Sequence, residues 1–338
     1  GPTCSMALGD LGADVIKVEH PERGDDTRDY GLRVGKTETT YFNSMNRNKR
    51  SIVLDLQTQQ GQERARELAR NCDVIIQNFK AGGMAKLGLG YEDLKKIKPD
   101  LVYCSVTGYA SDTGEATRPG YDIVIQGEAG LMAINGEASQ PPLKFGVAIV
   151  DMVTGLYSAQ AVLAALFDRQ RTGTGRHIEM ALFDCGLMIT AYYGLDALLT
   201  GVDPARCGNN HPSIVPYGVF DAADGPLVIA VGNNAQFSKF CTEIIERPDL
   251  AADPRFRTNL LRSANREALI PAIKEEIARR PRDWLLPALA DAGIPSGKVL
   301  GLLETLTSAR ARDADLVTAQ PHPEAGKTHI LASPDRKS

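Results

Sequence analysis

Short β-branched runs alternate with helical patterns through the first half of the chain. Four apolar runs predict strands, at residues 14–19, 51–56, 73–77 and 101–107. Three stretches around them predict helices, at residues 6–11, 60–70 and 91–97. This strand–helix–strand order indicates an α/β fold with a mostly parallel sheet that helices cover on both faces.

The longest helical pattern runs from residue 151 to residue 171. Its leucines recur at helical spacing, two arginines occupy the last turn, and Gly173 follows, as helix C-termini favour. A strand over residues 177–182 and an apolar helix through about residue 199 come next.

The composition changes at residues 201–217, a loop rich in Gly, Pro and Asn that indicates the entry to a second unit. Residues 217–221 and 227–231 flank the turn AADG and predict a hairpin. Three helical patterns follow, over residues 235–245, 265–279 and 282–292.

Composition and charge narrow the class of protein. The chain has 338 residues, 43% hydrophobic and 24% charged, which is typical of a folded globular protein. With 38 basic against 42 acidic side chains there is no basic excess, so we expect no nucleic-acid partner. No apolar run approaches the roughly 20 residues that cross a bilayer, so we expect no membrane partner.

The six cysteines lack C-x-x-C spacing and the five histidines are scattered, so we expect no metal site and no redox pair. A reducing compartment fits this pattern best. We expect the cytoplasm, and a mitochondrial location stays open if a targeting segment precedes Gly1. The phosphate-loop, dinucleotide and serine-hydrolase motifs are all missing, which disfavours those three chemistries.

Asp151 is the carboxylate of most interest. The apolar run GVAIV leads directly into it, at the start of the longest predicted helix. The positive end of the helix dipole favours its ionised form, and partial desolvation would make it a stronger nucleophile. From the local pattern alone, the commoner alternative is a helix N-cap.

Three further segments are candidates for binding. The basic cluster NRNKR (residues 46–50) could receive phosphates, or could be a solvated turn. His20 and Asn78 each close a predicted strand, at the edge where α/β proteins bind ligands. Surface turns are the alternative interpretation of both.

Taken in order, segments along almost the whole chain resemble the class III CoA-transferase (CaiB/BaiF) family, with its formyl-CoA transferase-like fold. The match is carried chiefly by GDLGADVIKVEHP (9–21), NRNKRSIVLDL (46–56), CDVIIQNFKAGGMAKLGLGYEDL (72–94), VDMVTG (150–155) and NNHPSIVPYGVF (209–220). The resemblance is strongest to the succinyl-CoA:glutarate type of dicarboxylate CoA-transferase, notably in MNRNKRSI, LGLGYEDL, SIVPY and GNNAQF.

The resemblance implies a mechanism and a set of site residues. Asp151 occupies the place of the family's nucleophile, which forms an aspartyl anhydride and then an aspartyl-CoA thioester. No cofactor is implied, since CoA and acyl-CoA are substrates. Supporting roles fall to Asp122, Tyr121 and His211. The CoA nucleotide is expected along His20, Leu54, Gln57, Asn78, Phe79, Lys80 and Lys86, where Lys86 replaces an Arg of some relatives.

The same resemblance implies a fold and an assembly. We expect a large Rossmann-like domain from residues 1–200, completed by 305–338, and a small α/β domain from 217–304. Residues 201–216 would form a linker and active-site loop. Two chains would interlock as a homodimer.

Formyl-transferring relatives carry a glycine-rich loop where this chain has residues 211–217, stiffened by Pro212 and Pro216, which weakens an oxalate or formyl assignment. Asn209, Asn210 and His211 could donate hydrogen bonds to a second substrate carboxylate, so we expect a small dicarboxylic acid as acceptor and succinyl-CoA as donor. No cation for that carboxylate is evident.

Two alternative functions fit the same family resemblance. An α-methylacyl-CoA racemase of the same fold needs a histidine base where this chain has Tyr121, and an ordinary phenol, with a pKa near 10, is a poor substitute. A non-catalytic CoA-binding protein is the second alternative, and the intact Asp151 argues against it.

Overall fold

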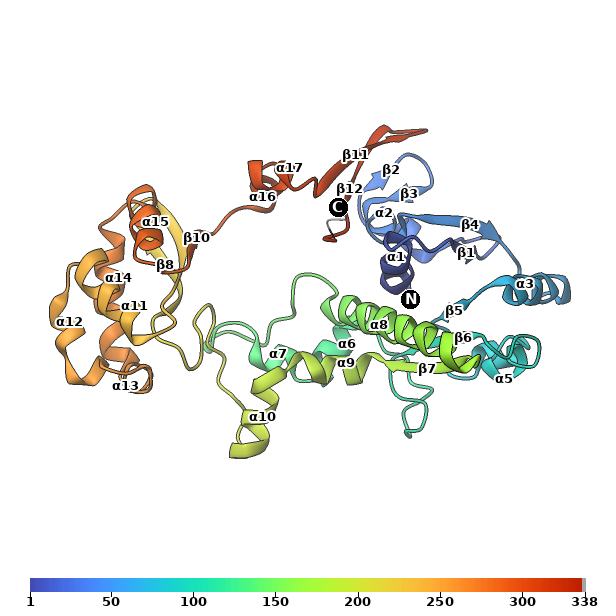
Figure 1. Ribbon diagram of the computed structural model, residues 1–338, viewed down its shortest axis with the longest axis horizontal. Coiled ribbons are helices and arrows are strands. Elements are labelled where there is room, and N and C mark those ends of the chain that lie inside the picture. Colours follow the sequence, from blue (N-terminus) through green and yellow to red (C-terminus); the bar gives the residue numbers. More distant parts are fainter. Residues whose placement is uncertain (336–338) are drawn as a thin grey trace. The chain divides into compact units, whose positions relative to one another are not determined.

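The computed structural model describes residues 1–335, which form two compact units (Figure 1). Unit 1 consists of residues 1–133, 144–204 and 308–335. Unit 2 consists of residues 134–143 and 205–307. Residues 134–143 thus fold with unit 2 although the sequence placed them in the large domain, and most of the expected linker belongs to unit 2 as well.

Unit 1 holds the parallel strands, confirming the α/β class. Its three-stranded sheet has the order β5 (Val74–Gln77), β6 (Val102–Thr107), β7 (Arg176–Ala181), with both pairs parallel. The central strand β6 is buried along almost its whole length, as its mostly apolar sequence predicts. β1 (Val15–Glu19) and β4 (Lys49–Val53) pair in parallel as a separate two-stranded sheet, so the expected single sheet is divided.

The long helix α8 (Ile149–Thr172) packs against β6, β7 and the N-terminal helix α1 (Pro2–Asp10). A Cβ added at Gly155 of α8 would lie 2.5 Å from the Cβ of Thr3, so only glycine allows the two helices this close. By length and composition alone α8 could cross a membrane, which the sequence analysis did not expect, and 39% of its most apolar stretch is buried inside the structure.

The remaining helices of unit 1 lie between these strands or follow them in the chain. They are α2 (Thr40–Asn46), α3 (Gln59–Asn71), α4 (Gly83–Lys86), α5 (Tyr91–Leu94), α6 (Asp122–Glu128), α7 (Leu131–Ile134), α9 (Leu182–Ile189), α10 (Ala191–Thr200) and α17 (Ala309–Asp313), with the 3₁₀ turn η1 (Asp26–Asp29). The apolar helix expected to continue to about residue 199 is broken. α9 and α10 meet at 80°, and Ala191 has a φ of 48°.

Two hairpins complete unit 1. β2 (Arg33–Val34) pairs with β3 (Glu38–Thr39), and β11 (Val317–His322) pairs with β12 (Gly326–Leu331), both antiparallel. His322 Nε2 lies 3.2 Å from Glu38 Oε2, which ties the second hairpin to the first. The end of the chain therefore returns to its beginning.

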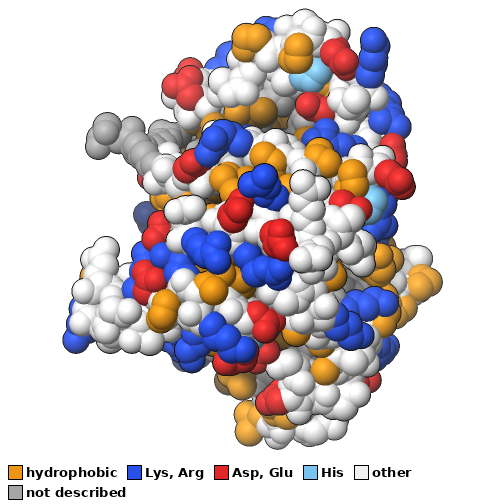
Figure 2. Space-filling view, turned by 90° about the vertical axis from the view of Figure 1, so that its right-hand side faces the viewer, with side chains coloured by type: hydrophobic (Ala, Val, Ile, Leu, Met, Phe, Trp, Pro, Cys, Tyr) orange, Lys and Arg blue, Asp and Glu red, His pale blue; other side chains and the backbone are white. Residues whose placement is uncertain are grey.

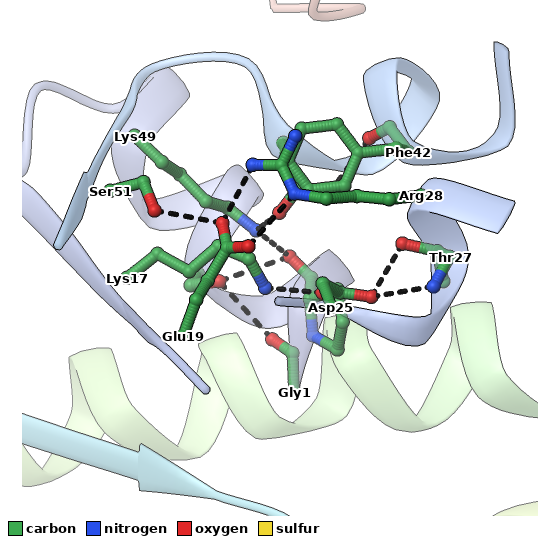
Figure 3. Close-up of polar contacts among 12 residues, drawn as sticks. Gly1, Lys17, Glu19, Asp25, Thr27, Arg28, Phe42, Lys49 and Ser51 are labelled. Atoms are coloured by element: carbon green, nitrogen blue, oxygen red, sulfur yellow. Dashed lines mark hydrogen bonds and ion pairs between the residues drawn. The ribbon is translucent and has the colours of Figure 1, made fainter. Parts of the chain in front are cut away.

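A polar cluster fixes the segment after β1 (Figure 3). The guanidinium of Arg28 makes two bonds of 2.8 Å to Glu19 and lies 3.8 Å from the ring centre of Phe42. Lys17 pairs with Asp25, and Lys49 Nζ donates to the carbonyl of Pro2 at 2.9 Å. The contacts of Arg28 and Asp25 hold the GDDTR segment against β1, and so fix the turn that begins at His20.

Unit 2 is an antiparallel sheet covered by helices. Its strands have the order β10 (Ser296–Lys298), β9 (Gly225–Ala230), β8 (Tyr217–Ala222). Its helices and turns are α11 (Asn234–Lys239), η2 (Phe240–Ile244), α12 (Pro248–Ala252), η3 (Pro254–Phe256), α13 (Asn259–Ala264), α14 (Arg266–Ala278), α15 (Arg282–Asp291) and α16 (Leu302–Leu306). Its core is built from apolar residues of β8, β9, α14 and α15.

Charge is mixed on the surface. Figure 2 shows acidic and basic side chains interspersed over one face of the molecule, without a continuous basic surface there. This matches the near balance of 38 basic and 42 acidic residues in the sequence.

Candidate active site

Asp151 lies in the first turn of α8, where main-chain N–H groups have no partner inside the helix. The residue before the helix, Ala148, offers no side-chain cap. The cap comes instead from α6, because Asp122 Oδ1 accepts the N–H of Val150 at 2.8 Å and that of Asp151 at 3.2 Å. A side chain distant in sequence therefore fixes where α8 begins.

Gln126 connects Asp122 to the loop before α8. Its side chain is buried, donates from Nε2 to Asp122 Oδ2 at 2.6 Å, and accepts the N–H of Phe145 at 2.7 Å. Both oxygens of Asp122 are thus occupied by hydrogen bonds. Asp122 therefore links the start of α8 to α6 and, through Gln126, to the loop before α8.

Two backbone segments, at Gly108 and Gly120, cross closely just before α6 and so position this helix at the site. A Cβ added at Gly120 would lie 2.6 Å from the Cα of Gly108, so glycine is required at this crossing. Beyond it, the hydroxyl of Tyr109 donates to Glu128 at 2.6 Å, and Arg118 pairs with the same carboxylate. These contacts anchor the loop that precedes Tyr121.

Asp151 opens into a cavity of about 240 Å³ within unit 1. The cavity wall includes the predicted residues Tyr121 and Asp122, so the structure brings these two together with Asp151. It also includes Tyr41 and Lys144, which sequence reasoning missed. Neither residue belongs to a strong periodic pattern in the sequence. The only sequence signal for Lys144 is its positive charge in a loop that contains prolines.

The environment of the cavity shifts the pKa values of two side chains that line it, Asp151 and Tyr41. Asp151 is exposed at the cavity, yet the surrounding chain removes part of its hydration. This partial burial raises the pKa of the Asp151 carboxyl, and the charge of Asp122 raises it further. Burial also raises the pKa of the Tyr41 phenol, with contributions from both carboxylates, so the three groups share one environment.

The predicted CoA-binding residues all lie in unit 1, mostly at the carboxyl ends of its parallel strands. His20 follows β1, Leu54 and Gln57 follow β4, Asn78, Phe79 and Lys80 follow β5, and Lys86 ends α4. The ring of Phe79 is 43% exposed, so it is accessible for stacking. Open α/β sheets bind their ligands at this end of the strands.

A hydrogen-bonded chain supports the turn at Phe79. The N–H of Phe79 donates to Gln77 at 2.7 Å, Gln77 Nε2 donates to Ser105 Oγ at 2.9 Å, and Ser105 Oγ lies 2.9 Å from His177 Nε2. Tyr91 stacks on His177 with the ring centres 4.8 Å apart. The turn is thereby joined to all three strands of the parallel sheet.

His211 lies in unit 2, where it lines a separate cavity of about 370 Å³ together with Arg266 and Tyr217. Its Nδ1 accepts the N–H groups of Ser213 and Ile214, each at 3.1 Å, so the neutral ring carries its proton on Nε2. Burial lowers the pKa of His211, and the charge of Arg266 lowers it further.

Known proteins resemble this chain over nearly its full length. The succinyl-CoA:glutarate CoA-transferase of Mus musculus is 40% identical over 330 residues, which cover 98% of this chain and 76% of that protein. The acetyl-CoA:oxalate CoA-transferase of Acetobacter aceti is 39% identical over 305 residues, covering 90% of this chain and 78% of that protein.

A solved structure agrees with these relatives. A CaiB/BaiF family protein from Brucella suis is 43% identical and superposes with a TM-score of 0.85, covering all of this chain and 88% of that one. The sequence also matches CoA-transferase family III from residue 1 to residue 338. The chain with Asp151 at the start of α8 therefore belongs to CoA-transferase family III and is a CoA-transferase.

Proposed function

We propose that this enzyme moves CoA from an acyl-CoA donor, succinyl-CoA in the first place, to a small dicarboxylic acid through covalent intermediates on Asp151. The observation that carries the proposal is the Asp151 carboxylate, which opens into a cavity while its own main chain is fixed by Asp122. No metal ion or cofactor takes part, and acyl-CoA is a substrate.

In the first half-reaction an oxygen of Asp151 attacks the thioester carbonyl of the donor. The carbon–sulfur bond breaks, CoA leaves as thiolate, and a mixed anhydride remains. The thiolate then attacks the aspartyl carbonyl of the anhydride, which forms an aspartyl-CoA thioester and releases the donor's carboxylate.

In the second half-reaction the carboxylate of the acceptor attacks the aspartyl-CoA thioester and expels CoA thiolate. The thiolate attacks the acceptor's carbonyl in the new anhydride, which forms the product acyl-CoA and frees Asp151. Each nucleophile and each leaving group is an anion, so no step requires a net proton transfer. This balance explains why the site needs no histidine base beside Asp151.

The site residues have distinct roles in this proposal. Asp151 reacts as the anion, and its raised pKa makes that anion more basic than an ordinary aspartate. Tyr41 and Tyr121 line the cavity and supply hydroxyl donors for a developing oxyanion. For His211 we propose the supporting role that the family resemblance implies. The CoA nucleotide binds along His20, Leu54, Gln57, Asn78, Phe79, Lys80 and Lys86.

We also propose that two chains form an interlocked homodimer. Large apolar side chains are exposed on α8, α9 and α10, more than a stable monomer usually leaves in water. They include Leu156, Leu163, Phe167, Met188, Leu195, Leu198 and Leu199. Sedimentation equilibrium at micromolar concentration should give twice the chain mass, and a monomer would refute the proposal.

For location we propose a reducing compartment, with the cytoplasm as the first candidate. All six cysteines are free thiols, and four of them are buried. Oxidation is therefore not needed to hold the fold.

The function is tested by incubating the enzyme with succinyl-CoA and a panel of free acids, and identifying new acyl-CoA species by mass. The panel contains glutarate, malate, itaconate, oxalate and a branched monocarboxylate at equal concentration. We expect a dicarboxylate other than oxalate to have the highest kcat/KM. A preference for oxalate or the monocarboxylate would overturn the substrate assignment, and the absence of any transfer would overturn the function.

The intermediate is tested separately. Enzyme quenched during turnover should carry an adduct on Asp151 that hydroxylamine converts to a hydroxamate, and Asp151→Asn should show neither adduct nor transfer. Sequential kinetics with no trapped species would overturn the covalent route.

A further inference from the structure

Lys144 faces the same cavity as Asp151, on the loop that leads into α8. Its Nζ donates to two carbonyls of its own loop, Phe145 at 3.1 Å and Gly146 at 3.4 Å. Within residues 1–335 it forms no ion pair with a carboxylate. A charged group bound at this point would therefore displace only neutral acceptors.

The position of Lys144 is fixed by its neighbours. The N–H of the next residue, Phe145, donates to buried Gln126, which also holds Asp122. The base of Lys144 is thus tied to the same hydrogen-bonded unit that sets the start of α8. Its side chain remains long and flexible, so the ammonium can move toward a ligand without disturbing the loop.

The charges on the cavity wall indicate which kind of substrate group Lys144 would favour. Two carboxylates, Asp122 and Asp151, line the cavity, and Lys144 is its one basic residue among those that the structure describes. A monocarboxylic acid reacts with Asp151 through its only carboxylate. A dicarboxylic acid brings a second negative charge, which the two carboxylates repel and only a cation favours.

The rest of the wall suits a short hydrocarbon chain. Ile123 and Val147 add apolar surface to the wall that carries the charged groups. An acyl chain of a few methylene groups would lie along such a surface, with one carbonyl at Asp151 and the other end free to meet a donor. This arrangement matches a linear dicarboxylic acid.

We propose that Lys144 is a specificity-determining residue, whose ammonium pairs with the substrate carboxylate remote from the reacting carbonyl. The inference rests on the proposed function and names the cation that selects dicarboxylic over monocarboxylic acids. A charge-assisted hydrogen bond of this kind is stronger than the two neutral contacts that Lys144 makes in the free enzyme.

The test is a competition between two acceptors of equal length, glutarate and pentanoate, with pentanoate in large excess so that both products are measurable. Both acids react with the same aspartyl-CoA enzyme, so the ratio of glutaryl-CoA to pentanoyl-CoA reports acceptor choice alone. Any contact of Lys144 with the donor cancels from this ratio. The variants are Lys144→Gln, Lys144→Arg and, as control, the exposed Lys327→Gln of β12.

We expect Lys144→Gln to lower the product ratio at least tenfold, as loss of a charge-assisted bond implies. Lys144→Arg should stay within about threefold of wild type because the charge is kept, and Lys327→Gln should not change the ratio. An unchanged ratio in Lys144→Gln, whether or not the rate falls, would overturn the inference while the transferase function stands. If wild type transfers CoA neither to these two acids nor to any acid of the panel above, the proposed function itself fails.

Discussion

Asp122 accepts the main-chain N–H of Asp151 at 3.2 Å, so the two acidic residues of the site meet through the backbone. Asp122 caps the helix, and Asp151 is the nucleophile that we propose. The arrangement separates two roles that the sequence left open for Asp151, N-cap and nucleophile, because the capping is done by a side chain on α6. The side chain of Asp151 is therefore not needed as the cap of α8.

The charge of Asp122 should set the pH dependence of the reaction. Partial burial and then Asp122 raise the pKa of Asp151, and the reaction needs the ionised form. Asp122→Asn removes the charge and keeps an acceptor, so the acid limb of the kcat/KM profile should move to lower pH. Profiles from pH 4 to 8 test this, with Asp112→Asn in an exposed loop as control. A limb that stays in place or moves upward contradicts it.

Asp122→Ala should cost stability, because the first-turn N–H groups of α8 lose their acceptor. Removal of a capping side chain costs about 1 kcal/mol of unfolding free energy. Urea denaturation followed by circular dichroism measures the loss. Asp122→Asn should retain more of the stability than Asp122→Ala, and the reverse order would contradict a capping role.

Asp151→Asn should gain stability at neutral pH. The native pKa of Asp151 is raised, so the folded protein holds this proton more tightly than the unfolded chain, whose pKa is about 3.9. Ionisation of Asp151 therefore lowers the free energy of unfolding as the pH rises above that value. The stability advantage of the variant over wild type should be larger at pH 7.5 than at pH 4. An advantage that is constant or shrinks over this range refutes the explanation.

His177 should make the fold sensitive to acid. Burial lowers its pKa, so the unfolded chain binds the proton first as the pH falls below about 6.5. Stability contributed by the neutral ring is then lost on going from pH 7.5 to pH 5. His177→Gln should lose less unfolding free energy over this interval than wild type, while the exposed His329→Gln should behave as wild type. Equal losses in all three proteins would contradict the prediction.

The backbone crossing before α6 should tolerate no side chain. Gly120→Ala places a Cβ 2.6 Å from Gly108, which we expect to cost roughly 1–3 kcal/mol and to lower kcat by displacing Tyr121 and Asp122. Gly114→Ala in the same loop meets no atom within 4 Å and is the matched control. Urea denaturation and steady-state kinetics measure both effects. Equal unfolding free energies and equal kcat values in the two variants would contradict the requirement for glycine at position 120.

The elements of regular structure were predictable because each has a local signal. The periodic leucines and the glycine that follows them, Gly173, predict a helix over residues 151–171. The observed helix α8 spans Ile149–Thr172. The bend at Ala191 was not predictable, since apolar residues continue through it and only tertiary packing separates α9 from α10. The division of the parallel strands into two sheets likewise depends on packing.

The site was predictable only where a motif marked it. Asp151 and Asp122 lie in family-like segments, and the structure joins them across 29 residues of sequence. Tyr41 and Lys144 reach the cavity from a short helix and an irregular loop, where no periodicity constrains a side chain. Their contribution follows from the three-dimensional path of the chain.

The hairpin β11–β12, which contacts β3 through His322 and Glu38, has a consequence for synthesis on the ribosome. The whole of residues 205–307 in unit 2 is translated between the bulk of unit 1 and this hairpin. At about 5–20 residues per second, the ribosome needs on the order of 6–25 s to pass from residue 205 to residue 331. During that interval Glu38 lacks its partner, and a nascent chain interrupted there leaves the domain that carries Asp151 unfinished.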